Sequence, residues 1–363
     1  MSIDLPGYQV MDELGYGAMG RVVLAREVSS DRLVAIKQLH IEASKAARSR
    51  LAREGRALAD LDNPHVVQFI GLQTVSDHLY LVLEYIDGPP LSAVLATGTP
   101  SVPNALAIIS QLAAGLSYIH GHGVVHRDVK PSNVLVSSAG TCKLNDFGLV
   151  RLLDMASGRP VPMTILTQEG MPIGTAAYMS PEAVVGDSTI DHRADLYALG
   201  VISYRLLLGR LPFPESLDLL PMLHAQLNSP VPPPATIDPY FPDSLAAPLL
   251  QSLQKDRNAR QSSVGDFWRE LEAAADAAWP GWPSEADLTT LTVQPDRPTP
   301  DHPTVSTVQP SIPLASTLLP VEAVVPEIPL LKRRRRTWGL VLSAGAGVAV
   351  SVGLFELISH LRH

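Results

Sequence analysis

The stretch His126-Arg-Asp-Val-Lys-Pro-Ser-Asn133 decides how the rest of the chain is interpreted. Asp128 offers a carboxylate that can accept a proton from an attacking hydroxyl group, and Lys130 places a positive charge two residues later. Asn133 offers an amide oxygen to a hard metal ion. These groups suit phosphoryl transfer, because its barrier falls mainly through positioning and charge neutralisation.

A second stretch, Asn145-Asp-Phe-Gly148, supplies another carboxylate at Asp146. A lone Asp or Asn in a turn usually caps backbone groups, but that explanation does not account for two such stretches in this order. Together they resemble the catalytic and metal-binding loops of the protein kinases, and Lys130 is typical of the serine/threonine type. The resemblance implies that Asp128 is the catalytic base and that Lys130 steadies the transferred group. It also implies that Asn133 and Asp146 hold Mg²⁺, or Mn²⁺ in its place.

Three glycines near the N-terminus lie in Leu14-Gly-Tyr-Gly-Ala-Met-Gly20. The spacing of Gly15, Gly17 and Gly20 is a weak signal, because dinucleotide-binding folds share it. Such folds need a helix directly after the glycines, whereas residues 21–27 read Arg-Val-Val-Leu-Ala-Arg-Glu, which favours a strand. We therefore expect a strand–loop–strand hairpin of the kind that kinases lay over ATP, with an ordinary β-turn as the alternative.

Val34-Ala-Ile-Lys37 follows on a short apolar strand. Lys37 resembles the kinase lysine that holds the α- and β-phosphates, although a lysine at a strand end is usually only solvated. Its partner should be a glutamate on the next helix, expected over residues 44–61. Glu54 is the candidate; Glu42 lies too near the strand, and Gly55 weakens the helix beside Glu54.

Residues 79–86 have the pattern of a buried strand and lead into Asp87-Gly-Pro-Pro90, which by resemblance is the hinge between two lobes. Leu83 would be the gatekeeper. The residues that the resemblance assigns to the nucleotide, besides the glycines and Lys37, are the backbone of Glu84 and Ile86 and the side chains of Leu14, Val22, Ala35 and Leu135. The apolar ones among them could equally be ordinary core.

Residues 103–121 carry apolar side chains at a period near 3.6, which predicts a helix that supports the catalytic loop. Gly174-Thr-Ala-Ala-Tyr-Met-Ser-Pro-Glu182 resembles the end of a kinase activation segment, although Ser180 replaces the usual alanine. By resemblance, Thr175 contacts the catalytic Asp and Lys. Asp195 would anchor the catalytic loop, and Arg260 would pair with Glu182.

Two further features concern regulation and the turn before the last helix. By resemblance, a phosphate on the activation segment neutralises Arg127, with Arg151 joining it. Thr164 and Thr167 are the candidate phosphosites, since a phosphate adds about −1.5 to −2 charge. Arg257 stands where the family usually has proline, and we expect it to change only the local turn.

The resemblance covers residues 8–275 and implies an α+β, bilobal protein kinase fold, with an N-lobe over about 8–84 and a C-lobe over about 88–275. The motifs of this region are similar to those of bacterial receptor-type (Hanks-type) serine/threonine kinases. We expect transfer of the ATP γ-phosphate to serine and threonine hydroxyls of proteins, including autophosphorylation. The alternatives are a pseudokinase scaffold and a small-molecule kinase of similar fold.

Beyond the kinase-like region the composition changes. Residues 279–331 are rich in Pro, Thr, Val and Ser and show little helix or strand periodicity, which predicts a disordered, partly extended linker. Five basic residues at 332–336 precede an uncharged segment, which predicts a transmembrane helix over 337–357. The basic run should stay in the cytoplasm, leaving a short external tail at 358–363. We expect a single-pass protein of the bacterial plasma membrane.

Small residues recur every fourth position in that segment, including Gly347, and a second row contains Gly345. Such rows let two helices approach closely in lipid, which favours a homodimer; the alternative is that glycine and alanine are simply common in single-span anchors. The net charge of −8 excludes a general nucleic-acid binder. The single cysteine, Cys142, excludes an intramolecular disulfide and a multi-cysteine metal site.

Overall fold

The computed structural model of the chain describes residues 5–17, 20–39, 59–75, 78–146, 173–279 and 293–294. The chain divides into two compact units, Met1–Thr304 and Val305–His363, and every described residue lies in the first. The predicted helix carrying Glu54, the segment with Arg151, Thr164 and Thr167, and the predicted membrane helix at 337–357 lie outside the described residues.

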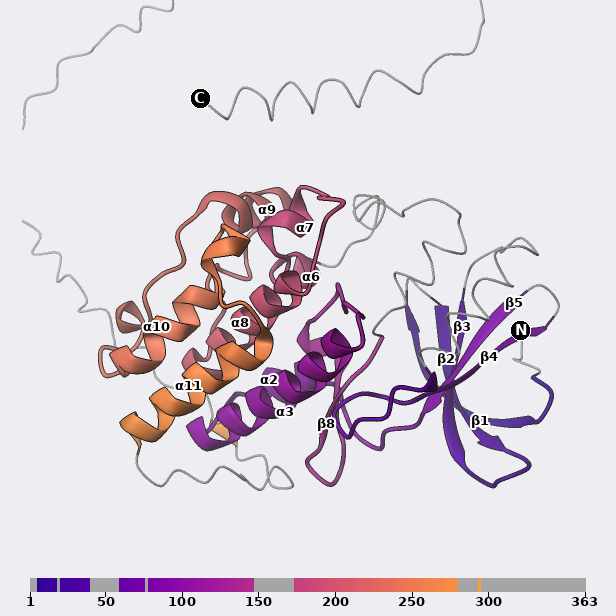
Figure 1. Cartoon of the computed structure of the whole chain (residues 1–363). Helices are drawn as coiled ribbons and strands as arrows, with labels where there is room; N and C mark the ends of the chain where they lie inside the picture. The colour runs from indigo at the N-terminus through magenta and orange to yellow at the C-terminus, as the bar shows by residue number, and fades with distance from the viewer. Residues whose placement is uncertain are drawn as a thin grey trace, which may run out of the picture. The chain divides into compact units, whose positions relative to one another are not determined.

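The first part of the chain forms an antiparallel sheet of five strands in the order β1-β2-β3-β5-β4 (Figure 1). The strands are β1 (Tyr8–Gly17), β2 (Gly20–Glu27), β3 (Leu33–Leu39), β4 (Phe69–Val75) and β5 (His78–Glu84). Side chains alternate between the two faces of a strand. Val34 and Ile36 accordingly pack with Val82 in a small core on one face. The other face carries Ala35 and Lys37, so the predicted nucleotide-contacting residues share a face.

The glycine-rich stretch is the turn of the β1–β2 hairpin, whose last pair is Gly17 and Gly20. The predicted strand–loop–strand arrangement is confirmed, and the dinucleotide-binding alternative is excluded because a strand, not a helix, follows the glycines. Gly20 has a φ of +141°, and a Cβ atom built on it would lie 1.7 Å from the carbonyl oxygen of Gln38. Only glycine fits this position.

Helices dominate the second part of the chain. They are α2 (Leu91–Ala96), α3 (Val102–Gly121), α6 (Ile173–Ala176), α7 (Pro181–Val184), α8 (Arg193–Leu208), α9 (Leu219–Asn228), α10 (Asp243–Ser252) and α11 (Val264–Ala278). Short 3-10 turns occupy Pro131–Asn133, Pro234–Thr236 and Arg257–Ala259. The remaining strands are β6 (Thr99–Pro100), β7 (Val134–Val136), β8 (Cys142–Leu144) and β9 (Val293–Gln294). This two-lobed α+β arrangement confirms the predicted fold class.

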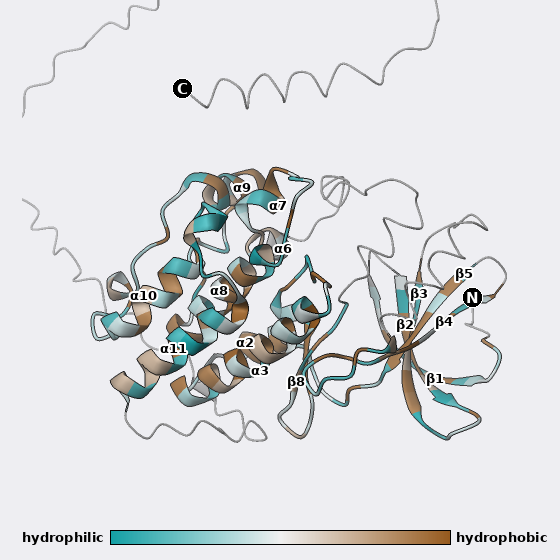
Figure 2. Ribbon diagram, in the orientation of Figure 1, coloured by the Kyte–Doolittle hydropathy of each residue, from teal (hydrophilic) through white to brown (hydrophobic). Residues whose placement is uncertain are grey.

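Helix α3 confirms the periodicity prediction and begins one residue earlier than expected. The hydroxyl of Ser101 caps it by accepting a hydrogen bond from the amide of Asn104. Its apolar side chains lie in the main core, and Figure 2 shows hydrophobic colour along most of its length. Among the described residues, α3 is the helix long and apolar enough to cross a membrane, but most of it is buried inside the fold. It is therefore a core helix.

Strand β9 lies inside the segment that the sequence predicts to be a disordered, partly extended linker, most of which is outside the described residues. Its partner is β6, far away in sequence. Periodicity within the linker could not reveal this pairing, because the other half of the ladder comes from the connection between α2 and α3.

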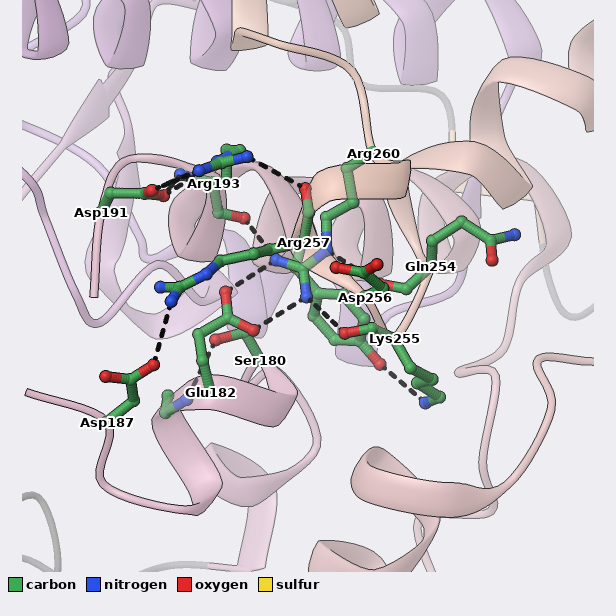
Figure 3. Close-up of polar contacts among 12 residues, drawn as sticks. Ser180, Glu182, Asp187, Asp191, Arg193, Gln254, Lys255, Asp256, Arg257 and Arg260 are labelled. Carbon is green, nitrogen blue, oxygen red and sulfur yellow. Dashed lines mark hydrogen bonds and ion pairs between the residues drawn. The ribbon is translucent and has the colours of Figure 1, made fainter. Parts of the chain in front are cut away.

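A buried ion pair ties the C-lobe helices together. The guanidinium of Arg260 donates to both carboxylate oxygens of Glu182, at 2.7 and 2.8 Å (Figure 3). It also donates to the carbonyl oxygens of Arg193 and Gln254, both at 2.8 Å. The Arg260 side chain is fully buried and that of Glu182 is 8% exposed. This pairing, which the resemblance implied, joins α7, the start of α8 and the turn before α11.

Arg257 has a wider effect than the sequence predicts. It begins the 3-10 turn Arg257–Ala259, and its guanidinium pairs with Asp187 at 3.1 Å. It also donates to the carbonyl oxygen of Thr189 at 2.9 Å, and Figure 3 shows the ion pair with Asp187. The expectation of a purely local change is therefore wrong. A long cation at this position reaches the loop after α7, which proline could not do.

Replacing Arg260 by Met should destabilise the protein by about 3–5 kcal/mol, because the Glu182 carboxylate would be left buried without its cation. The double variant Glu182→Leu, Arg260→Met should recover part of the loss, since no buried charge remains. Urea unfolding measures both. Arg269→Met is the control, because that side chain is 72% exposed in its own ion pair and should matter little. Equal losses for Arg260→Met and Arg269→Met would contradict the argument.

Candidate active site

A buried carboxylate holds the stretch around residue 128 in place. Asp195, in the first turn of α8, accepts hydrogen bonds from the backbone amides of His126 at 2.7 Å and Arg127 at 2.8 Å. The ring Nε2 of His120 lies 2.8 Å from the same carboxylate. Burial opposes ionisation, but the hydrogen bonds and the electrostatic influence of the His120 and His126 side chains keep the pKa of Asp195 below its usual value. Arg127 adopts a φ of +67°, a conformation that these bonds stabilise.

The carboxylate of Asp128 lies among polar groups from its own loop and from α6. Its Oδ2 accepts from Lys130 Nζ at 2.9 Å and from Asn133 Nδ2 at 2.8 Å. Lys130 also donates to the hydroxyl of Thr175 at 3.2 Å. The structure thus brings Asp128, Lys130 and Asn133 together, and the contact of Lys130 connects Thr175 to this group. The arrangement fixes a carboxylate beside a cation, where an incoming hydroxyl group can be deprotonated.

The second carboxylate, Asp146, faces the sheet. Its Oδ2 lies 2.7 Å from Nζ of Lys37, which is 6% exposed. Its Oδ1 is buried and has no hydrogen-bond partner among the described residues. Lys37 therefore pairs with Asp146 in this structure, while the expected partner Glu54 lies outside the described part. Like Arg127, Asp146 has a positive φ, +60°.

The two predicted metal ligands lie on neighbouring backbone segments, because the amide of Asn145 donates to the carbonyl of Asn133 at 2.8 Å. The Asn133 amide nitrogen is directed at Asp128, which leaves its amide oxygen as the ligand atom. A buried, unpartnered carboxylate oxygen on Asp146 and an amide oxygen fit a hard ion such as Mg²⁺. Across the described residues, no group of three or more His, Cys, Asp or Glu side chains could hold a metal.

Two of the predicted nucleotide-contacting side chains, Val22 and Ala35, lie on the strands β2 and β3 of the sheet that carries Lys37. Val22 pairs with Lys37 across β2 and β3, and Ala35 pairs with Leu83 across β3 and β5. Val22 and Ala35 are half-buried, as is Leu135 on β7, which bridges to Pro90 in the hinge. These positions are apolar but not covered by the core, as a ring-binding surface requires.

Three of the predicted nucleotide contacts differ in how accessible they are. The backbone N–H of Glu84 donates to the carbonyl of Gln68 at 2.9 Å, so it is not available to a nucleotide. The Leu14 side chain, on β1, is 45% exposed. Ile86 lies beyond the end of β5 and is buried. The structure therefore places Ile86 at the hinge and leaves Leu14 partly exposed to solvent.

One ion pair at the site was missed by sequence reasoning. Lys143 Nζ, on β8, lies 2.9 and 2.8 Å from the two carboxylate oxygens of Glu84. Glu84 Oε2 also accepts from the amide of Gln68 at 3.1 Å. The pair connects the end of β5 to the strand that leads into Asp146. No local signal could have found it, because the two residues are 59 positions apart.

Known proteins share this combination of fold and site. A family model described as the protein kinase domain matches residues 8–268. The serine/threonine-protein kinase pkn2 of Myxococcus xanthus is 36% identical over 278 residues, which cover 74% of this chain and 32% of that protein. The probable serine/threonine-protein kinase PknB of Lactococcus lactis is 32% identical over 269 residues, covering 73% of this chain and 41% of that protein.

Solved structures show the same likeness. The crystal structure of the Mycobacterium tuberculosis PknI kinase domain aligns with a TM-score of 0.57 at 27% identity, covering 75% of this chain and 98% of that one. The chain itself spans about a third to two fifths of the length of the two curated relatives. The match over residues 8–268, together with the loops around Asp128 and Asp146, shows that this chain belongs to the protein kinase family and that its relatives include bacterial serine/threonine kinases.

Proposed function

We propose that this chain is a serine/threonine protein kinase that transfers the γ-phosphate of ATP to hydroxyl groups of proteins, itself included. The observation that carries the proposal is the connected set Asp128, Lys130 and Thr175, with contacts of 2.9 and 3.2 Å. Asp128 is the base for the attacking hydroxyl, and Lys130 is the cation for the transferred group. The hydroxyl of Thr175, on α6, orients that cation.

Each charged residue has a separate task in this reaction. Asp128 accepts the proton of the substrate hydroxyl as the oxygen attacks the γ-phosphate in line. Lys130 offsets negative charge on the transferred group. Lys37, which pairs with Asp146 here, holds the α- and β-phosphates when a nucleotide binds. Asn133 and Asp146 would hold Mg²⁺, which supplies neutralisation of the phosphate oxygens.

The nucleotide base belongs on the half-buried apolar surface of Val22, Ala35 and Leu135, with the hinge backbone at Ile86 beside it. The N–H of Glu84 is already used by Gln68. On Glu84 the carbonyl group is therefore the part that an adenine amino group could reach. Leu14 and the glycine turn would cover the ring and phosphates from the β1–β2 hairpin.

A pseudokinase scaffold is the rival from another class. Such a protein binds partners through the same fold and would lack the base, the lysine or a metal ligand. Asp128, Lys37, Asn133 and Asp146 are all present, which supports phosphate transfer over a scaffold role. A small-molecule kinase is less well supported, because Lys130 and its Thr175 contact are those of protein-directed members.

Regulation and location are part of the same proposal. A phosphate on Thr164 or Thr167 would neutralise Arg127 and Arg151 and order the activation segment. The uncharged segment after the basic run at 332–336 would anchor the chain in the bacterial plasma membrane, with the kinase domain in the cytoplasm. Association of two such helices through their small residues would favour phosphorylation between copies.

Asp128→Asn should lower the rate of phosphate transfer to a protein substrate by about 10²- to 10⁴-fold, because it removes the base and leaves the fold intact. Lys37→Met and Asp146→Asn should also abolish most activity. Radiolabelled phosphate transfer measures the rate, and thermal unfolding checks the fold. Arg26→Met is the control, since it breaks only an exposed ion pair with Asp31. Near-wild-type transfer by Asp128→Asn would refute the proposed function and favour a scaffold.

Lys143→Met should raise the KM for ATP by about fivefold to tenfold, because the hinge residue Glu84 loses the cation that holds it. This corresponds to a loss of about 1 kcal/mol in the free energy of ATP binding. The effect on kcat should be smaller, since Lys143 does not touch the transferred group. The double variant Glu84→Gln, Lys143→Met should recover part of the affinity. Steady-state kinetics over a range of ATP concentrations separates the two constants. A loss confined to kcat would contradict a role at the hinge.

The full chain should sediment with membranes and resist a high-salt wash, which removes proteins held only by basic residues. A variant without residues 337–357 should stay in the soluble fraction. Replacing two central residues, Val348 and Val350, by Lys should have the same result, because each charge costs about 2.5–3.5 kcal/mol in the bilayer centre. Membrane-bound protein that the salt wash releases would exclude a spanning helix.

A further inference from the structure

A short strand pair lies outside the active-site loops. Strand β6 (Thr99–Pro100) forms the connection between α2 and α3 and pairs antiparallel with β9 (Val293–Gln294), which follows the last helix of the C-lobe. The register places Thr99 opposite Gln294 and Pro100 opposite Val293. Neither the catalytic residues nor the nucleotide surface uses this pair, so it needs an explanation of its own.

The register determines which residues carry the hydrogen bonds. Opposed residues in an antiparallel ladder alternate between pairs that exchange both N–H···O bonds and pairs that exchange none. Pro100 has no N–H, so its pair with Val293 must be of the second kind. The pair of Thr99 with Gln294 is therefore the one that exchanges hydrogen bonds in both directions.

The β6 side of the pair is held by the C-lobe itself. Thr99 is 8% exposed, and a Cβ atom built on Gly209, the residue that ends α8, would lie 2.7 Å from its hydroxyl oxygen. Gly98 before it has a φ of +140°, and Ser101 after it caps α3. The backbone of β6 is thus fixed before any strand is added, and only β9 loses conformational freedom on pairing.

The sequence around β9 suits this role. Residues 288–294 read Leu-Thr-Thr-Leu-Thr-Val-Gln, which is rich in β-branched residues. Pro295 follows, and the residue before a proline prefers an extended backbone. The chain also has enough length, because the 14 residues that follow Trp279, the cap of α11, as far as Val293 can span about 45 Å.

We propose that the α2–α3 connection is a binding surface for the chain's own linker, which adds a strand at Thr99 through Val293–Gln294. The remaining part of the linker then begins after Gln294 instead of at the end of α11. The strand shortens the tether between the kinase domain and the C-terminal segment. The tether then starts beside the N-terminal end of α3 and the C-terminal end of α8. The pairing depends on neither ATP nor a membrane, so it can fail while the proposed function stands.

Hydrogen–deuterium exchange of the Thr99 amide in the full chain tests this proposal. Gln294→Pro removes the N–H that bonds to Thr99 and prevents the reciprocal pairing. We expect exchange at Thr99 to become about fivefold to tenfold faster. Val293→Pro is the matched control, because the N–H it removes belongs to the pair that exchanges no hydrogen bonds. That variant should leave Thr99 as protected as in the original chain.

Three results would overturn the proposal. The first is equal exchange at Thr99 in the original chain and in Gln294→Pro. The second is an equal loss of protection in both proline variants, which would make the register wrong. The third is protection that disappears on dilution, because the strand would then come from a second copy. Exchange at the buried amide of Leu112, in the middle of α3, reports whether each variant keeps its fold.

Discussion

The carboxylate of Asp195 is the interaction on which the catalytic geometry depends. It lies at the N-terminal turn of a buried helix, where the helix dipole favours negative charge. From there it accepts hydrogen bonds from the backbone amides of His126 and Arg127 and contacts His120. A backbone with a positive φ at Arg127 is unfavourable on its own. The loop keeps this shape because the buried acceptor would otherwise lose its partners.

The charges around the site are balanced in pairs before any ligand binds. Asp128 has Lys130, and Asp146 has Lys37. In the proposed reaction, a nucleotide with a metal ion would bring both signs of charge, so it could exchange partners with these residues without leaving a buried charge alone. The Oδ1 of Asp146, which is buried and has no hydrogen-bond partner among the described residues, is an acceptor that a cation could contact. Preorganised charges of this kind need little rearrangement during the reaction.

Long-range ion pairs connect parts of the fold that meet at the site. Glu84 and Lys143 join the hinge to β8, and β8 is held beside the N-terminal lobe because Val67 donates to the Leu144 carbonyl at 2.9 Å. Arg260 and Glu182 join the end of the activation segment to the turn before α11. Arg257 extends this second connection to Asp187. The substrate-facing segment is thus attached to the helical core by charge as well as by packing.

The sequence by itself determined the fold class, the hairpin at the glycines, helix α3 and the residues Asp128, Lys130, Asn133 and Asp146, because each of these has a local signature. Hydrophobic period, glycine spacing and short polar motifs are properties of neighbouring residues. The resemblance also implied the pair of Arg260 with Glu182, whereas only the tertiary structure decided four other pairings. Lys37 with Asp146, Lys143 with Glu84, Arg257 with Asp187, and β9 with β6 each join residues distant in the chain. Such contacts depend on how packed elements bring side chains and strand edges together, and a local sequence pattern does not predict that packing.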